Sequence, residues 1–95
     1  MDRQDDKLTD LRRQIDTLDE QLLQLLASRM ADVRLVGQYK KSRGLPPLDE
    51  KRWRAVLQSR LDRAEALDLS EEFITKLYQL IHEYSLIIEA ESGPS

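Results

Sequence analysis

The chain has 95 residues, of which 40% are hydrophobic and 35% are charged, with a formal net charge of −3. That length allows one small domain with a limited core, and the acidic charge argues against nucleic-acid binding. Without cysteine there are no disulfides or thiolate metal sites, and a single histidine argues against a histidine metal site. We find no signal peptide and no apolar run near the roughly 20 residues that span a bilayer, so we expect a cytoplasmic protein with no membrane contact.

Apolar residues spaced alternately by three and four predict a first helix over residues 5–42. Two aspartates at positions 5 and 6 suit its N-terminus, and the glycine and two prolines of residues 44–47 end it. Gly37 lies inside the pattern, where a missing side chain can allow two backbones to approach closely. The apolar stripe consists of Leu8, Leu11, Ile15, Leu18, Leu22, Leu25, Leu26, Val33 and Val36.

Two further helices are predicted over residues 49–66 and 70–91, with residues 92–95 as a disordered tail. Asp49 and Ser70 are the expected N-caps. The chain is therefore predicted to be all-α, a single helical domain over residues 1–95. The residues of the second helix expected to face inward are Trp53, Val56, Leu57 and Leu61. The apolar stripe of the third helix consists of Phe73, Leu77, Leu80, Ile81, Tyr84, Ile87 and Ile88.

The first helix is too long for a compact chain of this size. It would extend about 55 Å, whereas a globule of this length has a diameter of roughly 30 Å. Its apolar stripe continues through the excess length, and exposing that stripe would be costly. We therefore predict an intertwined homodimer in which the long helices pack on each other.

Two cations, Arg29 and Lys40, fall on the apolar stripe of the first helix. Arg12 lies roughly 25 Å from Arg29 along the helix, so it can serve the same small pocket only from an antiparallel partner chain. A buried cation without a partner is costly, and Arg29 alone could pair with Asp32 or Glu20. Taken together, the three cations favour a pocket for a small anion.

Polar residues of the other two helices are weaker candidates. Arg52 lies in a first turn, where the helix dipole disfavours a cation; an exposed Asp49–Arg52 pair is the alternative. Ser85 and Glu89 lie one turn apart beside the apolar stripe, where a role in binding and simple solvation at the edge of the stripe are the two alternatives. His82 is expected to be structural or exposed, because no second histidine or nucleophile accompanies it.

These residues resemble a known family. The segment LRRQIDTLDEQLLQLLASRMADVRLVGQYK (residues 11–40), the D..R of residues 49–52 and LYQLIHEYS (residues 77–85) are similar to the all-helical chorismate mutases of the AroQ class. The resemblance covers residues 8–89. It implies an entwined dimer of three-helix chains with two active sites, chorismate as substrate, prephenate as product, and no cofactor or metal.

The resemblance also implies roles for the cations of the first helix. Arg12 of the partner chain and Arg29 would grip the carboxylates of the substrate. Lys40 would contact the ether oxygen and a carboxylate. The cations would then face inward because the substrate is a dianion.

On the other helices, the resemblance places Asp49 near the ring hydroxyl, mainly through its backbone. Arg52 would support the carboxylate end of the substrate, and Ser85 would bind the ring carboxylate. The reaction needs neither a nucleophile nor a proton transfer. It needs a flexible dianion held in its reactive conformer and negative charge stabilised on the ether oxygen.

Two substrate-binding positions depart from the family pattern. Trp53 stands where the usual glutamate contacts the ring hydroxyl. Glu89 stands where many bacterial members carry a glutamine that donates to the ether oxygen, and a carboxyl group can donate only when protonated. The charge state of Glu89 is left open by the sequence.

These departures keep other functions in view. On the same fold, the substrate could be 4-amino-4-deoxychorismate, or isochorismate could lose pyruvate. A non-catalytic helical dimerisation module is the alternative from another class; it would place Arg29, Lys40 and Ser85 on solvated faces. Feedback regulation and a partner enzyme of the shikimate pathway are also left open.

Overall fold

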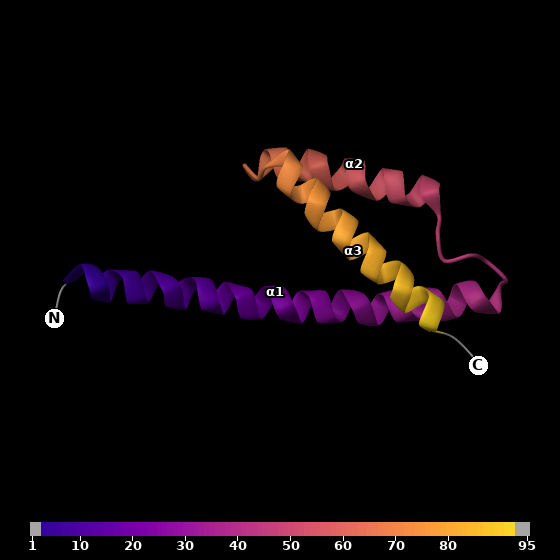
Figure 1. Cartoon of the computed structure of the whole chain (residues 1–95), viewed down its shortest axis with the longest axis horizontal. Coiled ribbons are helices and arrows are strands. Elements are labelled where there is room, and N and C mark those ends of the chain that lie inside the picture. Colours follow the sequence, from indigo (N-terminus) through magenta and orange to yellow (C-terminus); the bar gives the residue numbers. More distant parts are fainter. Residues whose placement is uncertain (1–2, 93–95) are drawn as a thin grey trace. The chain divides into compact units, whose positions relative to one another are not determined.

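The computed structural model describes residues 3–92, which form three α-helices and no β-strand (Figure 1). Helix α1 spans Arg3–Ser42, α2 spans Glu50–Ala66 and α3 spans Glu71–Glu91. The predicted all-α class with a very long first helix is confirmed, although α1 begins two residues earlier than predicted. Of the predicted tail, residues 93–95 lie outside the described part. No helix within residues 3–92 is both long enough and apolar enough to cross a membrane.

The chain divides into two compact units, Met1–Ala31 and Asp32–Ser95, and the division falls inside α1. The described part of the first unit is α1 alone. Met30 is its one buried residue among positions 5–31, while Leu18 and Leu25 expose 61% and 68% of their surface. The rest of the predicted stripe up to residue 25 is also exposed in the single chain, as Leu8, Leu11, Ile15 and Leu22.

In the second unit, α2 packs against α3 (Figure 1). The buried apolar residues of the two helices are Val56, Ala64, Ile74 and Ile88. Four residues of the predicted stripe of α3 lie on a second apolar face of the helix, which is exposed in the single chain. They are Phe73, Leu80, Tyr84 and Ile87.

Both predicted N-caps of this unit are confirmed. The Asp49 side chain accepts a hydrogen bond from the backbone N–H of Arg52 at 3.0 Å, and α2 begins at the next residue. The Ser70 hydroxyl accepts from the N–H of Phe73 at 3.2 Å at the start of α3. Each cap satisfies a backbone donor that the first turn would otherwise leave free.

The ends of α1 and α2 are closed by the same kind of turn. After α1, the N–H of Leu45 donates to the carbonyl of Lys40 at 2.8 Å, and Gly44 takes a positive φ of 67°. This is a Schellman motif, in which glycine is preferred. After α2 the corresponding residue is Asp68, with φ of 58°, a conformation that costs a non-glycine residue about 1–2 kcal/mol. The turn at Gly44 leaves Lys40 in the last turns of α1, facing the chain that follows.

Candidate functional site

Lys40 and Glu89 form the centre of the site within the second unit. The Lys40 Nζ lies 2.6 Å from the Glu89 Oε1 and donates to the carbonyl oxygen of Pro47 at 2.5 Å. The two side chains are only 20% and 10% exposed. One ammonium therefore joins α1, the loop after it, and α3. The reading of Lys40 and Glu89 as solvated residues is wrong.

The Glu89 carboxylate can accept a further hydrogen bond. Its Oε1 is buried and, within residues 3–92, receives no hydrogen bond of normal geometry, although the Lys40 Nζ is within ion-pair distance. The contact with Lys40 is therefore an ion pair and not a directed hydrogen bond. A buried oxygen in this state is costly to leave without a donor. A bound ligand could supply one.

Gly37 allows the end of α1 to lie directly on α3. A Cβ at this position would lie 2.8 Å from the Cα and 2.9 Å from the carbonyl oxygen of Glu89, and 3.2 Å from the Cβ of Ser92. Two of these three atoms are backbone and cannot move aside cheaply. The predicted close approach of two backbones at Gly37 is confirmed, and Lys40 follows one turn later on the same helix.

Ser85 lies one turn before Glu89 on α3 and is also buried. Its hydroxyl donates to the carbonyl of Ile81 at 2.6 Å. The reading of Ser85 as a solvated residue is wrong. Because residues four apart lie on one side of a helix, Ser85 and Glu89 present two polar groups from the same buried face.

At the start of α2, Asp49 and Arg52 meet through the backbone rather than as an ion pair. The Asp49 carboxylate holds the N–H of Arg52, and the Arg52 side chain is exposed and forms no ion pair with the described part of the chain. The alternative of an Asp49–Arg52 ion pair is therefore wrong. The Arg52 guanidinium is left available to an anion.

Trp53, the next residue, stacks on His82 of α3. The ring centroids are 4.0 Å apart and the planes differ by 9°. Both side chains are half-buried. Sequence reasoning gave His82 no part in the site; the signal that could have found it is its position three residues before Ser85 on the same side of α3.

Arg12 and Arg29 belong to the first unit. Arg12 is exposed and Arg29 is half-buried. Their predicted roles toward a carboxylate, and the alternative pairing of Arg29 with Asp32 or Glu20, stay predictions.

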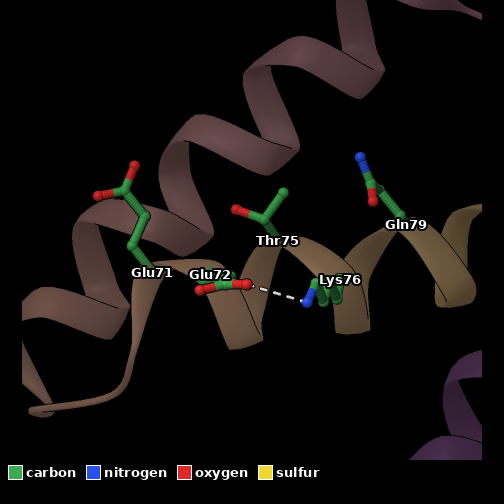
Figure 2. Close-up of a pocket in the computed structure, with 5 residues that line it drawn as sticks. All are labelled: Glu71, Glu72, Thr75, Lys76 and Gln79. Atoms are coloured by element: carbon green, nitrogen blue, oxygen red, sulfur yellow. Dashed lines mark hydrogen bonds and ion pairs between the residues drawn. The ribbon is translucent and has the colours of Figure 1, made fainter.

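Two surface hollows of the second unit are poor candidates for an anion site. One is formed by the first turns of α3 and is lined by Glu71, Glu72, Thr75, Lys76 and Gln79; its one cation, Lys76, pairs with Glu72 at 2.9 Å (Figure 2). The other carries three carboxylates and no cation, with the lining Gln58, Leu61, Asp62, Glu65, Leu69 and Glu71. Both hollows would repel a dianion. Across residues 3–92, no cluster of histidine, aspartate and glutamate could hold a metal ion.

Most of the chain is similar to known proteins. A family model described as chorismate mutase type II matches residues 11–90. The chain is 38% identical over 87 residues to the T-protein of Enterobacter agglomerans, which covers 92% of this chain and 23% of the relative. It is 37% identical over 86 residues to the T-protein of Haemophilus influenzae, covering 90% and 23%. The match to the bifunctional chorismate mutase/prephenate dehydratase of Escherichia coli is 38% over 79 residues, covering 83% and 20%. The chain thus spans less than a quarter of the length of these relatives.

Proposed function

Because the chain belongs to the chorismate mutase type II family, we propose that it is an isomerase that rearranges chorismate to prephenate in phenylalanine and tyrosine biosynthesis. The observation that carries the proposal is the partly buried Lys40, held against Glu89 where the end of α1 meets α3. A partly buried ammonium at this point is well placed to meet an anionic substrate away from bulk water.

The cations and Ser85 together bind the two carboxylates of the substrate. Arg29 and Arg52 offer planar guanidinium groups, which suit bidentate contact with a carboxylate. The Ser85 hydroxyl can donate to the ring carboxylate once it leaves the carbonyl of Ile81. Asp49 acts by fixing the first turn of α2, which carries Arg52.

The reaction breaks the C–O bond of an enol ether while a C–C bond forms within the same molecule. No atom enters or leaves, and no proton is transferred. The Lys40 ammonium stabilises the negative charge that builds up on the ether oxygen, and Glu89 holds that ammonium in place. Holding the dianion in its compact conformer supplies the rest of the rate enhancement.

A homodimer completes the proposal. The exposed stripe of α1 and the exposed apolar face of α3 support it, because such surfaces are rarely left open to water. In an antiparallel pair of α1 helices, Arg12 of one chain reaches the pocket that holds Arg29 of the other. A cytoplasmic location stays a prediction.

The test is to mix the purified protein with chorismate and follow the loss of its absorbance and the appearance of prephenate. We expect turnover by the wild type and a loss of about 100-fold or more in kcat for Lys40→Ala, because a cation facing developing charge is removed. Lys76→Ala is the matched control, since Lys76 is an exposed lysine paired with a glutamate. Wild-type activity that survives Lys40→Ala unchanged would contradict the assignment of Lys40.

Trp53 favours a second candidate on the same fold. Its indole cannot accept a hydrogen bond, unlike the carboxylate usual at this position, so a substrate with a different ring substituent is accommodated. Product analysis with 4-amino-4-deoxychorismate and with isochorismate separates these reactions from the mutase reaction. A lack of reaction with all three substrates would favour the alternative of a non-catalytic helical module.

A further inference from the structure

His82 continues the line of polar residues that α3 presents at the site. It precedes Ser85 by three residues and Glu89 by seven, which places it about 4.5 Å and 10 Å away from them along the helix axis. Ser85 and Glu89 are buried and His82 is half-buried. The imidazole therefore lies one turn from a buried hydroxyl, at a separation that one small substrate can bridge.

The stack with Trp53 fixes the plane of the imidazole. With the rings 4.0 Å apart and 9° from parallel, the indole covers one face of the imidazole. The two ring nitrogens lie in the plane of the ring, at its edge, and the stack leaves this edge uncovered. Trp53 thus restricts the directions in which His82 can form hydrogen bonds.

The nitrogens of His82 have no hydrogen-bond partner in the part of the chain that the structure describes. An imidazole can both donate and accept, because one nitrogen of the neutral ring carries a hydrogen and the other carries a lone pair. The three neighbouring polar groups of the site are already engaged: Lys40 with Glu89, and Ser85 with a backbone carbonyl. The His82 nitrogens, in contrast, have no hydrogen-bond partner within residues 3–92 and can bind a further polar group.

We propose that His82 is a substrate-binding residue that hydrogen-bonds the hydroxyl or amino substituent of the substrate ring, and that Trp53 orients it. This inference rests on the proposed function. In that proposal, the cations and Ser85 bind the two carboxylates of the substrate, and Lys40 contacts the ether oxygen. The ring substituent is the polar group that remains, and an imidazole can both donate to it and accept from it.

The first experiment compares His82→Phe with the wild type. Phenylalanine keeps an aromatic ring for the stack and removes both nitrogens. We expect KM for chorismate to rise about fivefold to tenfold, the effect of one lost hydrogen bond, with a smaller change in kcat. Tyr78→Phe is the matched control, because it removes a polar atom from a ring of the same helix that lies under Arg60, one turn further from the site. Its KM should stay at the wild-type value.

The second experiment reads the residue directly. The chain has one histidine, so a ¹⁵N-labelled protein gives one set of imidazole signals. Saturation with prephenate should shift both ring nitrogens. No turnover of any substrate by the wild type would overturn the proposed function. An active wild type, with an unchanged KM in His82→Phe or unmoved imidazole signals at saturation, would overturn the assignment of His82 alone.

Discussion

At the scale of single residues, the site depends on the ion pair between Lys40 and Glu89. The sequence predicts Lys40 as an inward cation, because its place on the apolar stripe is a local pattern. It does not predict that Glu89 is its partner, since the two lie far apart in the chain and meet only when α1 and α3 pack. The same holds for Trp53 and His82, whose stack joins two helices. Long-range pairs of this kind leave no periodic signal.

Glu89 should influence how well the site tolerates its substrate. The Glu89 carboxylate lies 2.6 Å from the Lys40 Nζ and would repel a dianionic substrate. An amide at this position removes that repulsion and can donate a hydrogen bond to the ether oxygen. We therefore expect Glu89→Gln to raise kcat/KM for chorismate, measured at one fixed pH.

The control is Glu72→Gln, the same substitution in the exposed pair with Lys76. Its kcat/KM should stay at the wild-type value. If Glu89→Gln also stays at the wild-type value, Glu89 plays no part in the chemistry.

At the scale of the helices, the site exists because α1 and α3 can touch at Gly37. The N-caps, the end of α1 and the special position of Gly37 were all predictable, since each has a residue type suited to it. The two faces of α3 were not separable, because Phe73 and Ile74 are adjacent and both apolar, and only packing decides which is buried. The left-handed Asp68 was missed because no glycine marks the end of α2.

Gly37→Ala should damage both stability and activity. Alanine is the better helix former by roughly 0.5–1 kcal/mol, but its Cβ would overlap the backbone of Glu89. Separating α1 from α3 should cost about 1–3 kcal/mol of unfolding free energy and lengthen the Lys40–Glu89 contact. We expect a lower melting temperature and a loss of at least about tenfold in kcat/KM.

Gln38→Ala is the matched control, because Gln38 is the next residue of α1 and is exposed. It should leave both measurements near the wild-type values. A Gly37→Ala protein as stable as the wild type would show that α3 can move away at no cost.

At the scale of the whole molecule, the apolar surface exceeds what one chain covers. The stripe of α1 up to residue 25 and the second face of α3 are both exposed. The sequence predicts the excess, because helix length can be compared with the size of a compact chain. It cannot assign Arg12 and Arg29 to one pocket without a model of how two chains meet.

Mixing two inactive variants should test a pocket built from two chains. If Arg12 acts across the dimer, Arg12→Ala and Arg29→Ala homodimers each lose both sites. A heterodimer carries both defects in one site and neither in the other. Statistical mixing should therefore restore about a quarter of the wild-type activity. Each variant alone is the control, and heterodimers that form without recovery would contradict the shared pocket.

The bare stripe of α1 also has a consequence for the timescale on which its backbone opens. A helix that packs against no other element is held only by its own hydrogen bonds, and it unfolds and refolds locally within about a microsecond. The amide protons of a packed pair of helices, such as α2 and α3, exchange with solvent only when that pair opens. In a lone chain, amide protons of α1 before residue 31 should therefore exchange fast, and those beyond it slowly, along one unbroken helix. A second chain on the stripe would slow the first group and leave the second unchanged. The rates of amide exchange along α1 would then report the fraction of the protein that is monomeric at any given concentration.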